Sequence, residues 1–170
     1  MLRSRWAVTV AASIALVLTW FRFSDTADRL IMLVLTVGSA YQGDSDARTR
    51  HVSRLVTYAM ASVVVIVLLA TSRLWSVVPV SAAVVGSGFF LLHLYRKESL
   101  GFGDVLLAPV LALYVGWFDV TAVPMWLIGA CLTAAVTAVV RRNRHVAFVP
   151  WLTSSAVVTI LCVGLQTYSG

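Results

Sequence analysis

Three aspartates in this sequence stand where a carboxylate could take part in acid–base chemistry: Asp44, Asp46 and Asp104. Each lies at one end of an apolar run, although a charge inside a membrane helix costs up to about 2.5–3.5 kcal/mol on insertion scales. Two carboxyl groups brought together can share one proton, because like charges at close range do not both ionise readily. An acid and a base beside one water molecule is the arrangement that aspartyl proteolysis needs.

The residues alone leave three interpretations of Asp104 open. It could cap the N-terminus of a helix, where the helix dipole favours a carboxylate. It could form a catalytic pair with one of the two earlier aspartates, or it could couple the movement of an ion. The remaining acids suggest less, since they lie in short turns where solvation or capping is the default. They are Asp25, Asp28, Glu98 and Asp119.

The chain that must position these aspartates is strongly apolar. It has 170 residues, of which 60% are hydrophobic and 12% charged, and its mean hydropathy is +0.92. This composition predicts an all-α integral membrane protein, with residues 1–170 forming a single transmembrane domain. About 20 apolar residues cross a bilayer as a helix. Seven such runs are expected, at 6–21, 27–43, 55–72, 75–94, 104–118, 120–140 and 146–166.

The distribution of basic residues predicts the orientation of these seven helices. Of the 13 Lys and Arg residues, three fall on one side of the expected topology: Arg22, Arg29 and Arg73. The other ten fall on the side of the N-terminus, which places the N-terminus in the cytoplasm and the C-terminus outside. This rule also accounts for the net charge of +6, so no nucleic-acid partner is expected. Asp44, Asp46 and Asp104 then lie near the cytoplasmic face, at the ends of the second and fifth runs.

No metal or cofactor is expected. The two cysteines, Cys131 and Cys162, lie in separate apolar runs, and the sequence has no C-x-x-C pair. There is also no cluster of residues with the spacing of metal ligands and no nucleotide-binding loop.

Three ordered segments resemble the type IV prepilin peptidases, the bacterial branch of the GxGD aspartyl proteases. "GFGDVLLAPVLALYVGW" (101–117) is similar to the family's G-x-G-D stretch. "DARTRHVSRLVT" (46–57) is similar to the segment that contains the family's first aspartate, and "GACLTAAVTAVVRRNRHVAFVPWL" (129–152) to a later helix and loop.

The resemblance implies which residues would act. Asp46 matches the first catalytic aspartate and Asp104 the second, while Asp44 is a possible alternative first acid. Gly101 and Gly103 would let the backbone approach closely and bend before the helix. The paired C-x-x-C insert of larger members is absent, so peptidase activity without methylation is expected. No metal is implied.

The resemblance also implies the setting and the partners. The substrates would be prepilins or pseudopilins, whose basic leader peptides would be removed at the cytoplasmic face of the bacterial inner membrane. The protein would be a multi-pass protein of the lipid bilayer, and a homo-oligomer is left open. Two other functions compete with this one: a small proton- or cation-coupled transporter, and a non-catalytic protein of pilus assembly. A transporter of this kind would show inverted repeats and acids near the midplane of the membrane, whereas no repeat is visible here.

Overall fold

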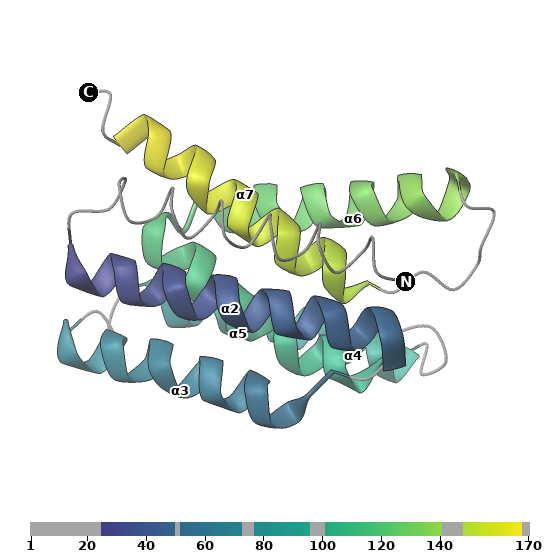
Figure 1. The fold of residues 1–170 in the computed structure, drawn as a ribbon, viewed down its shortest axis with the longest axis horizontal. Coiled ribbons are helices and arrows are strands. Elements are labelled where there is room, and N and C mark those ends of the chain that lie inside the picture. The colour runs from purple at the N-terminus through teal and green to yellow at the C-terminus, as the bar shows by residue number, and fades with distance from the viewer. Residues whose placement is uncertain (1–24, 50–51, 73–76, 96–100, 141–147, 168–170) are drawn as a thin grey trace.

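The computed structural model describes residues 25–49, 52–72, 77–95, 101–140 and 148–167, which form six α-helices and contain no strand (Figure 1). The helices are α2 (Thr26–Thr49), α3 (Arg54–Ala70), α4 (Val77–Tyr95), α5 (Phe102–Phe118), α6 (Ala122–Val140) and α7 (Val149–Thr167). The expected all-α class is confirmed for this part of the chain. The expected run at 6–21 lies outside the described residues, so seven crossings of a membrane stay a prediction.

The six helices follow the expected apolar runs closely, with one informative difference. Helix α2 continues to Thr49, whereas its apolar run ends at residue 43. The extra turns contain Asp44 and Asp46, which are therefore part of a regular helix rather than of a loop. Hydropathy detects the apolar part of a helix only, while backbone hydrogen bonds continue through a polar segment that lacks Gly and Pro.

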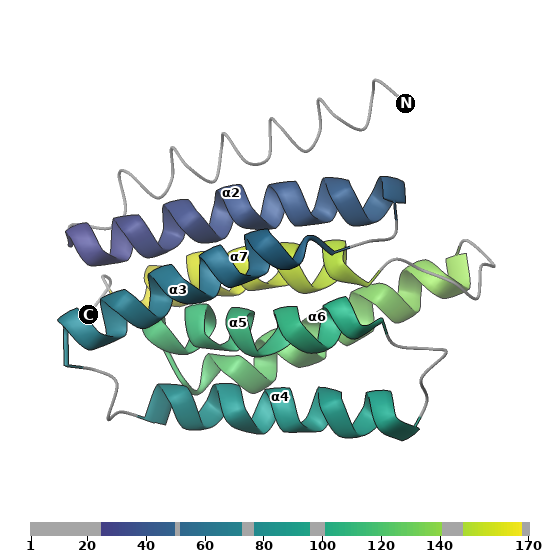
Figure 2. The same cartoon turned by 90° about the horizontal axis from the view of Figure 1, so that it is seen from below.

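Successive helices run in opposite directions, and α5 lies at the centre of the bundle. Figure 2 shows α5 with α3 on one side and α4 on the other, and α5 contacts each of the other five described helices. This central position explains its burial: ten of its 17 residues are buried, although the helix contains Pro109.

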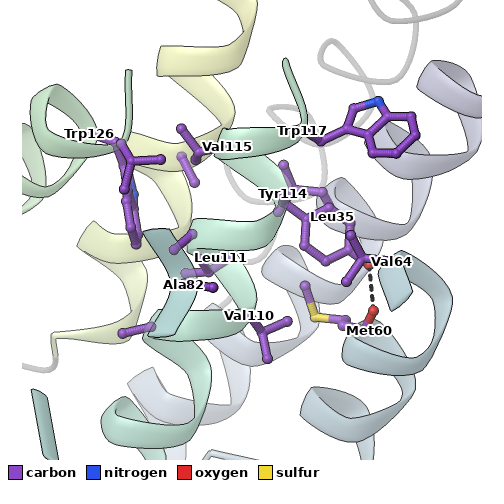
Figure 3. Close-up of a cluster of buried hydrophobic side chains, with 14 of the residues drawn as sticks. Leu35, Met60, Val64, Ala82, Val110, Leu111, Tyr114, Val115, Trp117 and Trp126 are labelled. Atoms are coloured by element: carbon purple, nitrogen blue, oxygen red, sulfur yellow. Dashed lines mark hydrogen bonds between the residues drawn. The ribbon is translucent and has the colours of Figure 1, made fainter. Parts of the chain in front are cut away.

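Buried side chains fix α5 against its neighbours in the middle of the bundle. Leu107, Leu111 and Tyr114 of α5 are fully buried. The Tyr114 hydroxyl donates a hydrogen bond of 2.8 Å to the backbone carbonyl of Met60 on α3 (Figure 3). A buried phenol needs such a partner, and this one fixes α5 relative to α3.

The helices at the periphery differ from α5. By length and composition, α4 and α6 are the two described helices that could cross a membrane. Large apolar side chains such as Val84, Leu91, Ile128 and Val139 are exposed on them. Apolar surface of this extent on long helices indicates contact with lipid rather than with water. These two helices therefore indicate that the protein associates with a membrane.

Candidate active site

The expected site residues lie at one end of the bundle, on two helices. Asp44 and Asp46 belong to the last turns of α2, and Gly101, Gly103 and Asp104 belong to the start of α5. Because α2 and α5 run in opposite directions, the C-terminal end of α2 and the N-terminal end of α5 face the same end of the molecule (Figure 2). The fold thus brings together residues that are 58 positions apart in the chain.

Asp46 and Asp104 lie close enough for their charges to interact. Asp46 is 7% exposed, and Asp104 is half-buried in the first turn of α5. Coulombic repulsion from Asp46 acts on the Asp104 carboxylate. Two carboxylates in this relation favour a state in which they hold one proton between them. Such a pair contains an acid and a base at the same time.

Asp44 lies on a different face of α2. Two residues of an α-helix span about 200° of rotation, so the side chains of Asp44 and Asp46 leave the helix on nearly opposite sides. Asp46 continues a buried stripe of α2 that includes Leu35, Ser39 and Gln42, whereas Asp44 is only half-buried. Of these two acids, Asp46 therefore has the better position for chemistry with Asp104.

Asp104 also caps its own helix. Gly101 is the N-cap residue of α5, and the Asp104 backbone N–H donates a 3.0 Å hydrogen bond to the Gly101 carbonyl. The Gly101 backbone in turn forms a hydrogen bond with the Asp104 carboxylate. The Asp104 carboxylate at the third helical position thus makes the half of a capping box that reaches back to the N-cap backbone, whereas Gly101 has no side chain to make the other half. The capping interpretation and the paired interpretation of Asp104 are thus compatible, because capping leaves the carboxylate within the field of Asp46.

The two glycines of the G-x-G-D segment differ in what they permit. A Cβ atom added to Gly103 would lie 2.6 Å from the Cβ of Val52, which is closer than real Cβ atoms approach. Close packing at this point therefore requires glycine. Gly101 has φ −65° and ψ 141°, a conformation open to every residue type, so its backbone needs no glycine. An added Cβ there would make a 3.4 Å contact with Asp104 Oδ2.

Aromatic and cationic side chains surround the start of α5. The Phe102 ring lies between two neighbours: the Arg54 guanidinium carbon is 5.8 Å from its centroid, and the His93 ring centroid is also 5.8 Å away. Phe102 itself is 44% exposed. Through these contacts, α3 and α4 both touch the segment that contains Asp104.

The start of α7 belongs to the same end of the bundle. The Phe148 ring stacks on Phe89 of α4 with 6.3 Å between centroids, and a Cβ on Gly43 would lie 3.9 Å from the Cα of Pro150. Phe148 and Pro150 therefore pack close to α4 and to the last turns of α2. The start of α7 thus lies at the end of the bundle that holds Asp46 and Asp104.

Sequence reasoning did not single out Gln42, which is fully buried and forms three hydrogen bonds near the site. Its spacing was the available signal, since a residue four positions before Asp46 lies on the same face of the helix. An amide inside an apolar run is also costly unless it is hydrogen-bonded.

The described residues contain no group of three or more His, Cys, Asp or Glu side chains that could hold a metal ion. Asp46 and Asp104 by themselves could carry out the acid–base chemistry of a carboxylate pair.

The fold and the composition together define a helical protein of the membrane-associated class. A model of the type IV leader peptidase family matches residues 30–139, well over half of the chain, so this protein belongs to that family. The match includes Asp44, Asp46 and the whole G-x-G-D segment, and it confirms the resemblance drawn from the sequence. No curated protein and no solved structure matches the chain. Family membership indicates a peptidase.

Proposed function

We propose that this protein is an aspartyl endopeptidase that removes the basic leader peptide of prepilins or pseudopilins at the cytoplasmic face of the bacterial inner membrane. The observation that supports it best is that Asp46, near the end of α2, and Asp104, in the first turn of α5, lie at the same end of the bundle, close enough for their charges to interact. Membership in the type IV leader peptidase family supports the same reaction.

The mechanism follows from a pair that holds one proton. The ionised carboxylate removes a proton from water, and the resulting hydroxide attacks the carbonyl carbon of the scissile peptide bond. The protonated carboxyl donates a hydrogen bond and then its proton to the carbonyl oxygen. When the tetrahedral intermediate collapses, the C–N bond breaks and the departing nitrogen takes up a proton from the pair. The two aspartates exchange roles during the cycle, as in other aspartic proteases.

The position of the pair suits a substrate whose helix lies in the membrane. The pair lies at the end of the bundle that, by the distribution of Lys and Arg, would face the cytoplasm. A prepilin helix in the bilayer would bring its leader peptide to that side, and its scissile bond would then meet the carboxylates at the membrane boundary.

Substitution of the three aspartates tests this proposal. A candidate prepilin co-expressed with wild type, Asp46→Asn, Asp104→Asn or Asp44→Asn is followed by the size of the processed product. Asn cannot exchange a proton, so we expect cleavage to fall about 10³-fold or more for Asp46→Asn and for Asp104→Asn. Asp44→Asn serves as the matched control on the other face of α2 and should stay within about threefold of wild type.

The outcomes separate the competing functions. Efficient cleavage by Asp104→Asn would exclude a proteolytic role for the pair and favour an ion-coupled transporter. Loss of cleavage in Asp44→Asn with retained cleavage in Asp46→Asn would assign the first acid to Asp44. Absence of cleavage by the wild type with every pilin-like protein of the same genome would favour a non-catalytic role in pilus assembly.

A further inference from the structure

The Gln42 side chain connects α2 to the segment that precedes α3. Its Nε2 donates hydrogen bonds to the Ser53 carbonyl (2.9 Å) and to Thr57 Oγ1 (2.8 Å), and its Oε1 accepts one from the Ser53 N–H (2.9 Å). The Ser53 N–H can only donate, which fixes the orientation of the amide. Thr57 Oγ1 closes the arrangement with a 3.1 Å hydrogen bond to the Ser53 carbonyl. Gln42 thus holds both backbone polar groups of Ser53.

The residue next to Ser53 contacts the G-x-G-D segment. Val52 packs so closely on Gly103 that no side-chain carbon fits between them. Gly103 immediately precedes Asp104, while Gln42 lies one helical turn before Asp46 on the same buried face. A continuous series of contacts therefore runs from the turn that contains Asp46, through Gln42, Ser53 and Val52, to the turn that contains Asp104.

We propose that Gln42 is a positioning residue that sets the placement of Asp46 relative to Asp104 by fixing the Val52–Ser53 segment between α2 and α5. Its effect on catalysis rests on the proposed peptidase function, whereas its effect on the placement of α2 does not. Ser39 provides the internal comparison. It lies on the same buried face of α2 at 6% exposure, but its hydroxyl forms no hydrogen bond within the described residues.

Distances between spin labels test the placement without relying on proteolysis. Cys131 and Cys162 are exposed and would first be replaced by Ala. Labels would then be attached at Tyr41 on α2 and Tyr95 at the end of α4, which are 56% and 82% exposed. Gln42→Met keeps the length of the side chain and removes all three hydrogen bonds. We expect it to shift or broaden the distance distribution by about 1–2 Å, the usual size of a helix displacement, while Ser39→Ala leaves the distribution unchanged.

Kinetics test the consequence for the reaction. With a prepilin substrate and purified, monodisperse enzyme, Gln42→Met should lower kcat about 10- to 100-fold, because misplacement of reacting groups by about 1 Å is enough for such a loss. KM should stay within about twofold of the wild-type value. Ser39→Ala should retain both constants. Thr57→Val removes one of the three partners of Gln42 and should give a smaller loss in kcat.

An unchanged distance distribution in Gln42→Met overturns the inference, as does full kcat despite altered distances. Altered distances together with reduced kcat support it. If Gln42→Met alters the distances but the wild-type protein cleaves no prepilin, the placement of α2 by Gln42 is supported and the proposed peptidase function is contradicted instead. If Gln42→Met does not accumulate in the membrane, the same spin labels are attached to Thr57→Val, which removes one of the partners of Gln42. An unchanged distance distribution in Thr57→Val then overturns the inference.

Discussion

The carboxylates at the two ends of the bundle are held in different ways. At the end opposite the candidate site, each described aspartate has a hydrogen-bond donor as its partner. Asp119 accepts from the backbone N–H and the hydroxyl of Thr121, at 2.8 and 2.7 Å. Asp25 accepts from the Ala27 N–H at 3.1 Å, and Asp28 accepts a 2.7 Å hydrogen bond from Trp117 Nε1. These groups cap helices or connect them.

At the other end, an acid faces an acid. Asp104 receives a hydrogen bond from the Gly101 backbone, but it is also removed from solvent by burial and lies in the electrostatic field of Asp46. Hydrogen-bond donors stabilise an ionised carboxylate, whereas a second carboxylate disfavours it. Carboxylates that oppose each other's ionisation are typical of functional sites. The comparison shows that the partner of an aspartate, more than its position at a helix end, indicates its role.

The largest expected difference between the carboxylates at the two ends of the bundle is that only those of the candidate site make the rate of cleavage depend on pH. Catalysis needs one protonated and one ionised carboxyl, so kcat/KM should follow a bell-shaped profile. The rate should fall about tenfold per pH unit on the acidic side, where both groups are protonated, and on the basic side, where both are ionised. Prepilin cleavage by enzyme in detergent micelles, measured from about pH 4 to 9, gives this profile.

Asp119→Asn is the control for the pH profile, because this residue belongs to the opposite end and should leave both limbs in place. A rate that does not vary over the whole range would contradict a shared proton between Asp46 and Asp104.

A smaller effect is expected from Gly103→Ala. The new Cβ would collide with Val52, so either the segment before α3 or the first turn of α5 must move, and cleavage should fall about tenfold or more. The matched control is Gly88→Ala on α4, where an added Cβ has no neighbour within 4 Å. Prepilin cleavage rates of the two variants give the comparison, and equal rates would show that the close approach at Gly103 is unimportant for the site.

The smallest effect on cleavage is expected from Trp117→Phe at the opposite end. This change removes the donor to Asp28 and should lower the free energy of unfolding by about 1.5–3 kcal/mol, the usual contribution of a hydrogen bond to a charged group. Cleavage should stay within about twofold of wild type, because the site is distant. Thermal unfolding in detergent measures the loss. As a control, Asp28→Asn retains an acceptor oxygen and should lower the melting temperature less than Trp117→Phe does. A strong loss of cleavage in Trp117→Phe would mean that the two ends of the bundle are coupled.

Much of the helical architecture could be predicted from hydropathy, since each described helix follows an apolar run of the expected length. The same measure placed the end of α2 six residues too early, because it does not detect a helix that continues into polar sequence. For Gly101, the expected bend requiring glycine is not present, and the observed φ of −65° suits any residue. Gln42 was overlooked because its spacing from Asp46 is a weak signal until its hydrogen-bond partners are known.

Sequence alone determined the apolar helices, the excess of basic residues on one side and the set of aspartates that could act, because these depend on residue types and on short spacings. The tertiary structure decided which of these residues meet. Whether Asp46 or Asp44 faces Asp104 depends on the rotation of α2, which is set by its packing against α3, α5 and α7. The role of Gln42 depends on the position of Ser53, and the requirement for glycine at position 103 depends on Val52. Contacts between distant parts of the chain arise from packing, and local sequence does not encode them.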